Sequence, residues 1–222
     1  MHKMDTLVRG RIPFEPRSWR TEFTRLSAAD REGSLSVEEL EQLALSAYML
    51  GLDDDCAVAW MRAHQEHLRR GDAHRAARCA FWQACGPLFR GELAPAMGWV
   101  ARGRRVLEAV PGECSEQGWL LVLTGLPVMF GGDPASACPH FVRAAEIAGR
   151  FDDLDLVTFA RLGQGMSLIL QQRIAEGMDL LDEVMVAVLT DELSPILTGI
   201  AYCSTIDMCH ACLLYTSPSP RD

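Results

Sequence analysis

Small and bulky apolar residues recur along this chain in a pattern that returns about every 40 residues. The pattern is clearest when Gly51, Gly91, Gly132 and Gln172 are aligned as anchors. Small residues lie seven positions before and five positions after each anchor: Ala44 and Cys56, Ala84 and Ala96, Gly125 and Ala137, Gly165 and Gly177. Nine positions after each anchor comes a bulky apolar residue, and a further core residue follows three positions later: Trp60 and Ala63, Val100 and Gly103, Phe141 and Ala144, Leu181 and Val184. Four copies in register indicate an internal repeat.

A repeat of this length predicts stacked pairs of helices. Small residues at a helix crossing allow two antiparallel backbones to approach closely, and the bulky residue fills the space between successive pairs. Each anchor glycine is where the first helix of a pair must stop, at a position that favours a left-handed backbone conformation. Asp53–Asp55 and Asp133–Pro134 follow two anchors and indicate helix starts, through a cap, a charge on the helix dipole, or proline in the first turn.

The chain is therefore predicted to be all-α, a right-handed superhelix of tetratricopeptide-like helix pairs with a period of about 40 rather than the usual 34 residues. Apolar residues at helical spacing, as from Val37 to Tyr48, agree with this prediction. The sequence contains no Asn-Gly or Asp-Gly dipeptide that would indicate a β-hairpin. Residues 1–34 are expected to form an N-terminal segment with a first helix and residues 35–211 the repeat array. Residues 212–222 are expected to be a disordered, non-native tail.

Charge and targeting signals narrow the class of partner. The net charge of −9 disfavours nucleic-acid binding by the chain as a whole. Residues 1–16 lack the apolar core of a signal peptide, and the longest uncharged run, residues 117–132, is too short to span a membrane. The eight cysteines are scattered through a long chain, as reduced thiols are. We expect a cytoplasmic protein that does not engage membranes.

Three groups of residues resemble chemical sites. His64 and His67 are three apart, not four as in zinc-protease helices, so exposed or half-buried helical histidines are the favoured interpretation. Cys209 and Cys212 have redox-motif spacing but fall within a helix that begins near Pro195, without the strand that such sites need. The arginines on the predicted helix that follows Gly91, namely Arg102, Arg104 and Arg105, suggest an anion site, although a solvated helix face is favoured.

No catalytic constellation emerges, and the chain is not expected to be an enzyme or to carry a metal or cofactor. The candidate binding surface is an apolar groove on the concave side of the array, able to accept a protein or small-molecule effector. Its expected lining comes from the first helix of each pair: Leu45, Tyr48, Phe81, Leu88, Leu126, Met129, Leu162 and Met166. The alternative is that these residues pack against neighbouring repeats.

Several stretches of the chain resemble the long class of LuxR-type bacterial transcriptional regulators: Leu40–Ala44, Ala47–Gly51, Arg62–His64, Gly71–Asp72, Ala76–Trp82, Gly98–Arg102, Leu180–Val188, Ser194–Pro195 and Tyr202–Ser204. The resemblance runs from about Trp19 to His210. It implies a tetratricopeptide-like sensor region, followed in that family by a C-terminal helix-turn-helix domain that contacts DNA. No such domain is present here, so DNA binding is expected only through a missing C-terminal domain.

Two hypotheses share this sequence. The first is the sensor half of a transcriptional regulator, which would switch between two arrangements or oligomeric states on binding its effector. The second is a stand-alone tetratricopeptide adaptor that joins other proteins. After His210 the expected next repeat gives way to a Ser-Pro run that is similar to translated sequencing adaptors, so we expect a fragment. The apolar face of its last helix, Ile196, Ile200, Cys203 and Ile206–Asp207, is then expected to be partly uncovered and to promote self-association.

Overall fold

The computed structural model describes residues 16–33, 35–190 and 193–216. Within these ranges it contains ten helices and no strand, which confirms the all-α prediction. The helices are α2 (Pro16–Arg31), α3 (Val37–Met49), α4 (Asp53–Arg70), α5 (Ala73–Phe89), α6 (Leu93–Glu108), α7 (Ser115–Phe130), α8 (Pro134–Arg150), α9 (Leu154–Leu170), α10 (Ile174–Leu189) and α11 (Pro195–Thr216). No helix in these ranges has both the length and the apolar composition needed to cross a bilayer.

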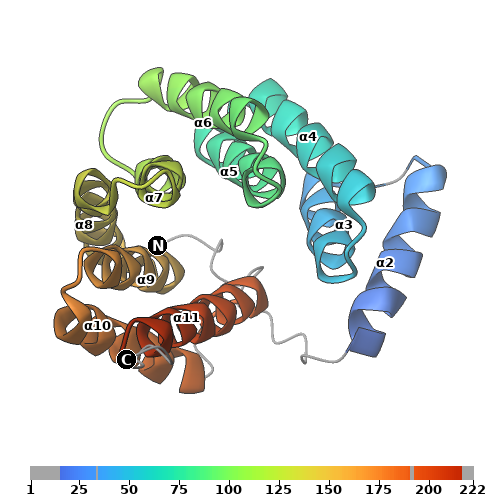
Figure 1. Ribbon diagram of the computed structural model, residues 1–222. Helices are drawn as coiled ribbons and strands as arrows, with labels where there is room; N and C mark the ends of the chain where they lie inside the picture. Colours follow the sequence, from blue (N-terminus) through green and yellow to red (C-terminus); the bar gives the residue numbers. More distant parts are fainter. Residues whose placement is uncertain (1–15, 34, 191–192, 217–222) are drawn as a thin grey trace. The chain divides into compact units, whose positions relative to one another are not determined.

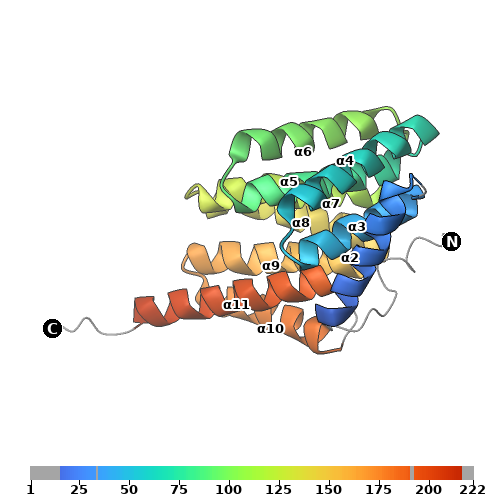
Figure 2. The same cartoon turned by 90° about the vertical axis from the view of Figure 1, so that its right-hand side faces the viewer.

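Each helix packs mainly on its neighbours in sequence, as a helical repeat does (Figure 1). Contacts join α2 to α3, α3 to α4, α4 to α5 and α5 to α6, and later join α8 to α9 and α9 to α10. The last helix, α11, lies beside both α9 and α10 (Figure 2). A core of this kind is built from local layers, in which each helix packs on helices that are near it in sequence.

The chain divides into two compact units, unit 1 (Met1–Leu123) and unit 2 (Thr124–Asp222), with the boundary inside α7. The predicted division into residues 1–34, 35–211 and 212–222 stays a prediction. Residues 1–15, most of the predicted N-terminal segment, lie outside the described residues, as do residues 217–222 of the predicted tail. Helix α11 continues through Cys212 to Thr216, so the predicted tail begins inside a helix.

The anchor glycines end the first helix of their pairs as predicted, and the structure adds Gln172. Gly51, Gly91, Gly132 and Gln172 all have positive φ, at 71°, 77°, 99° and 65°. Around the first of them, the N–H of Gly51 donates to the carbonyl of Tyr48 and that of Leu52 donates to the carbonyl of Ala47. This Schellman pattern satisfies the last carbonyls of the helix, and its left-handed residue is least strained when it is glycine.

The residues at all four repeating positions are buried. At the crossing of α9 and α10, a Cβ on Gly177 would lie 2.6 Å from the carbonyl oxygen of Gly165. The ring of Phe141 occupies the space that Cβ atoms on Gly125 and Gly163 would need, at 2.8 and 2.5 Å. In this part of the chain, small residues therefore mark helix crossings, and Phe141 fills the space between one helix pair and the next.

Helix starts follow the sequence signals. Asp72, Asp133 and Asp153 each accept a hydrogen bond from a backbone N–H of the following turn, and Pro134 occupies the first turn of α8. Asp53–Asp55 mark the start of α4 as expected, but through charge and not through a cap, because Leu52 is the N-cap and no side-chain hydrogen bond caps this helix. The three aspartates lie in the first turn, where their negative charge interacts favourably with the positive end of the helix dipole.

Candidate functional site

Among the candidate groove residues of unit 1, only Phe81 is fully buried, with 1% of its surface exposed. Its ring meets Trp82 and Trp119 edge-on, at centroid distances of 4.9 and 4.7 Å. Leu45, Tyr48 and Leu88 are half-buried. These three side chains therefore present apolar surface at the predicted groove positions, whereas Phe81 belongs to an aromatic cluster of the core.

Among the candidate groove residues of unit 2, Leu126, Met129, Leu162 and Met166 are all buried. The hydroxyl of Ser167 donates to the sulfur of Met129 at 3.3 Å. A ligand could touch these four side chains only if the surrounding helices moved apart. A groove that runs through all eight positions stays a prediction.

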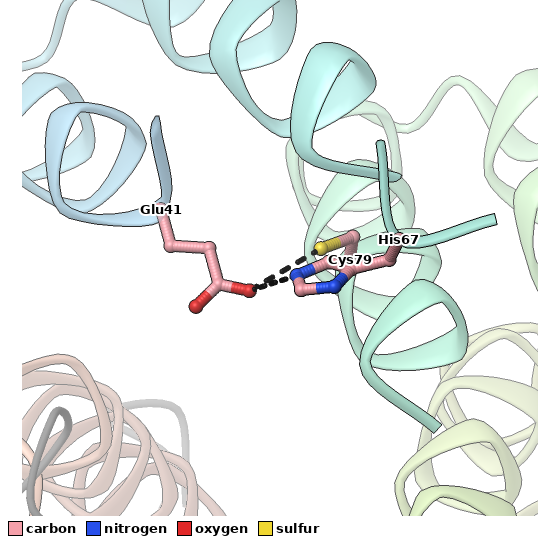
Figure 3. Close-up of side chains that lie close together, drawn as sticks. All are labelled: Glu41, His67 and Cys79. Atoms are coloured by element: carbon pink, nitrogen blue, oxygen red, sulfur yellow. Dashed lines mark hydrogen bonds and ion pairs between the residues drawn. The ribbon is translucent and has the colours of Figure 1, made fainter. Parts of the chain in front are cut away.

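One group of potential metal ligands among the described residues is the Glu41 cluster, formed by Glu41 of α3, His67 of α4 and Cys79 of α5 (Figure 3). The Nε2 of His67 lies 2.7 Å from Oε1 of Glu41. The thiol of Cys79 lies 3.9 Å from the same oxygen. Figure 3 shows both side chains pointing toward this single carboxylate oxygen. Three consecutive helices thus converge on one atom.

Arg75 holds the other side of the Glu41 carboxylate. Its Nη2 donates to Oε2 of Glu41 at 2.8 Å, and its Nη1 donates to Oε1 of Glu38 at 3.2 Å. The side chains of Arg75 and Glu41 are 14% and 19% exposed, so the contact between them is largely shielded from water. Because each oxygen of the Glu41 carboxylate has a partner, these contacts orient it toward His67 and Cys79.

The Cys79 thiol is completely buried. Burial, followed by the negative charge of Glu41, raises the pKa of Cys79 well above that of a free cysteine. Since the thiolate is the nucleophile in cysteine chemistry, this residue is inert toward redox exchange as it stands. The chemistry open to the cluster is hydrogen bonding or the binding of a cation that displaces the thiol proton.

The prediction that His64 and His67 are exposed or half-buried is wrong, because both are buried, at 0% and 1% exposure. Their helix, α4, packs against both α3 and α5, which cover the face that carries them. Nδ1 of His64 donates to the carbonyl of Ala76 at 2.8 Å, and its Nε2 accepts from Nε of Arg102 at 2.7 Å. Burial lowers the pKa of His64, and the nearby Arg102 charge lowers it further, so the ring is neutral.

A second polar group, the Glu116 cluster, contains His74, Cys114 and Glu116. Arg78 donates to Oε1 of Glu116 at 3.2 Å, and Nδ1 of His74 lies 3.5 Å from Oε2. The Arg78 guanidinium also stacks 4.5 Å from the centre of the Trp119 ring. This cluster joins α5 to the start of α7, and its His74 side chain is 46% exposed.

The arginine group on α6 forms an exposed helix face. Arg102, Arg104 and Arg105 are all exposed, and Arg102 is engaged with His64. The two cysteines of the redox-like motif, Cys209 and Cys212, lie within α11 as predicted.

On α11 the predicted apolar face is covered at its start and open further along. Ile196 is buried, Ile200 is half-buried, and Cys203, Ile206 and Asp207 are exposed. Self-association through this face stays a prediction.

Sequence reasoning singled out His67 but missed its partners Glu41 and Cys79, as well as Glu116 of the second cluster. Glu41 and Cys79 are 38 residues apart, and so are Arg78 and Glu116. Each pair lies on first helices of consecutive helix pairs, about one repeat apart. The sequence signal that could have indicated these contacts is a polar residue that recurs one repeat later on an otherwise apolar helix face.

No protein-family model matches the chain, and no curated protein matches it.

Proposed function

We propose that this chain is the effector-binding, tetratricopeptide-like region of a bacterial transcriptional regulator. The observation that supports a binding role is the packing of ten described helices mainly on their sequential neighbours. Arrays of this type expose long surfaces relative to their core, and they use those surfaces to hold peptides, proteins or small molecules. The proposed role in a regulator rests on the resemblance of the sequence to the LuxR-type class. The proposal includes a right-handed superhelix of helix pairs for this chain.

In this proposal the effector binds apolar surface on the first helices, beginning with the half-buried Leu45, Tyr48 and Leu88. Binding shifts the array between two arrangements, because an effector acts through its differential affinity for them. DNA contact belongs to a C-terminal helix-turn-helix domain, and no residue of this chain is assigned to it. The chain contributes the sensing half of the switch.

A stand-alone adaptor is the second candidate, and exposed apolar residues on α4 favour it. Val58, Met61 and Leu68 lie on one face of this helix and are 49%, 39% and 38% exposed. Apolar side chains gathered on a helix face suit a protein partner better than a small ligand.

One experiment separates the two candidates. The gene is read from source DNA through and beyond the codon for His210, and the protein that it encodes is tested for retardation of DNA from its own upstream region. A frame that continues into a helix-turn-helix domain, with DNA retardation that disappears when that domain is deleted, supports the regulator. A stop codon after Asp222, together with no retardation, overturns the regulator and leaves the adaptor.

A further inference from the structure

The Glu41 cluster brings together a carboxylate oxygen, an imidazole nitrogen and a sulfur from three different helices. These three atoms all lie within 4.8 Å of one another. We propose that Glu41, His67 and Cys79 bind a divalent transition-metal cation of the zinc class, which ties α3, α4 and α5 together. This proposal does not depend on the function proposed above.

The distances suit such an ion after small side-chain rotations. Zinc binds oxygen and nitrogen at about 2.0–2.2 Å and sulfur at about 2.3 Å, so tetrahedral neighbours stand roughly 3.3–3.6 Å apart. The oxygen–nitrogen distance of 2.7 Å between Glu41 and His67 would open by about half an ångström to reach this geometry. The 3.9 Å oxygen–sulfur distance between Glu41 and Cys79 would close by a few tenths.

The state of His67 favours coordination, and His64 on the same helix provides the contrast. Both ring nitrogens of His64 have partners, in Ala76 and Arg102. In His67, Nε2 faces Glu41 while Nδ1 is buried without a hydrogen-bond partner. Because a carboxylate oxygen only accepts, Nε2 carries the ring proton in the metal-free protein, and an ion that binds at Nε2 would move that proton to Nδ1, where no other group is bound. Nε2 is then free to act as a ligand.

The charges balance for a dication. On binding, the Cys79 thiol releases its proton to water, and the resulting thiolate and the Glu41 carboxylate together supply two negative charges, with neutral imidazole as the third ligand. Arg75 stays on the far oxygen of Glu41, where an outer hydrogen bond orients a ligating carboxylate. Arg75 also pairs with Glu38, so its charge is compensated locally.

The donor set selects the class of metal. Magnesium and calcium bind oxygen ligands, whereas a mixed sulfur, nitrogen and oxygen set is typical of zinc and its neighbours. The Glu41 side chain is 19% exposed, so one edge of the cluster reaches solvent and water can occupy a fourth position.

Cobalt(II) is the probe, because tetrahedral cobalt bound to thiolate gives an ultraviolet charge-transfer band and intense visible bands. The titration uses the full chain with Cys203→Ser, Cys209→Ser and Cys212→Ser, which removes the less buried thiols of α11. We expect one equivalent of cobalt to develop both bands and one equivalent of zinc to abolish them. If the bands are absent from this folded parent protein, the proposal is overturned whatever its variants do.

Two cysteine variants locate the site. Cys79→Ala should lose the charge-transfer band, whereas the matched variant Cys114→Ala, which removes the thiol of the Glu116 cluster, should retain it. Loss in Cys114→Ala and retention in Cys79→Ala would overturn the assignment. Circular dichroism in chelator checks that each variant is folded. His67→Gln supplies a second test, because it leaves every thiol in place and should still lose the visible tetrahedral bands.

Thermal unfolding provides an independent readout. Excess zinc should raise the melting temperature of the parent above its value in chelator, because an ion that binds the folded state stabilises it. The same addition should leave the melting temperature of folded Cys79→Ala unchanged. An equal rise in both proteins would contradict the proposed site.

Discussion

Units 1 and 2 hold consecutive helix pairs together with different chemistry. In unit 1, polar side chains join α3, α4 and α5 through Glu41, His67 and Arg75. In unit 2, an aromatic ring and glycines do the corresponding work, with Phe141 packed against Gly125 and Gly163. Consecutive helix pairs can therefore be joined either by a polar network or by close apolar packing. The two solutions respond to different perturbations, since packing depends on volume and a polar network depends on partners and protonation.

The largest effect is expected in unit 2 from Phe141→Ala. The ring is completely buried, and the flanking glycines have no side chains that could fill the space it leaves. The free energy of unfolding should fall by about 3–5 kcal/mol, measured by urea denaturation. Phe130→Ala, which truncates a side chain that is 65% exposed, is the control and should change little. Equal effects would show that Phe141 does not support the packing of its helix pair.

Gly177→Ala tests the close crossing of α9 and α10. The added methyl would meet a backbone oxygen of Gly165 at 2.6 Å, and that oxygen cannot move without shifting the helix. We expect a loss of about 1–3 kcal/mol in unfolding free energy, although alanine is the better helix former. Gly149→Ala has no atom within 4 Å of the added carbon and should be neutral or stabilising. Stabilisation by both changes would contradict the crossing.

Glu41→Ala tests the polar network of unit 1, in protein kept free of metal by chelator. It removes the acceptor for Arg75 and His67, and unpaired buried donors cost about 1–3 kcal/mol. Glu66→Ala, whose partners on α4 are exposed arginines, serves as the control and should leave the urea midpoint unchanged. A Glu41→Ala midpoint equal to that of the parent would mean that the network does not stabilise unit 1.

The smallest effect is expected at the ion pair between Asp30 of α2 and Arg62 of α4. Two contacts of 2.7 Å join the carboxylate and the guanidinium. The hydrogen bond from Arg62 lowers the pKa of Asp30 in the folded protein, so the pair stabilises the fold at pH values above the ordinary aspartate pKa. This contribution is lost as the pH falls through the lowered folded pKa.

Asp30→Asn measures that contribution. At neutral pH the substitution should cost under about 1 kcal/mol, because both side chains are partly exposed. The difference between parent and variant should vanish in acid, as measured by urea denaturation at several pH values. A difference that stays constant with pH would assign the effect to packing rather than to charge.

Local regularity made much of the fold predictable. Each first helix stops at an anchor because that residue adopts a left-handed conformation. The next helix begins two residues after the anchor, and this spacing can be found in the sequence. Even Gln172, which lacks the freedom of glycine, was identified by its place in the repeat and has a φ of 65°. The side-chain exposure of His64 and His67 was not predictable in this way, because it depends on which neighbouring helices cover α4.

The sequence by itself determined the helices, their pairing and the places where they cross, because small residues and turn residues act over a few positions and recur with the repeat. Tertiary structure alone decided which polar groups meet. Glu41, His67 and Cys79 belong to three helices, and their spacing along the chain matches no local motif. Their contact arises from the way α4 packs between α3 and α5, and that packing is set by the sum of many apolar contacts rather than by any one residue.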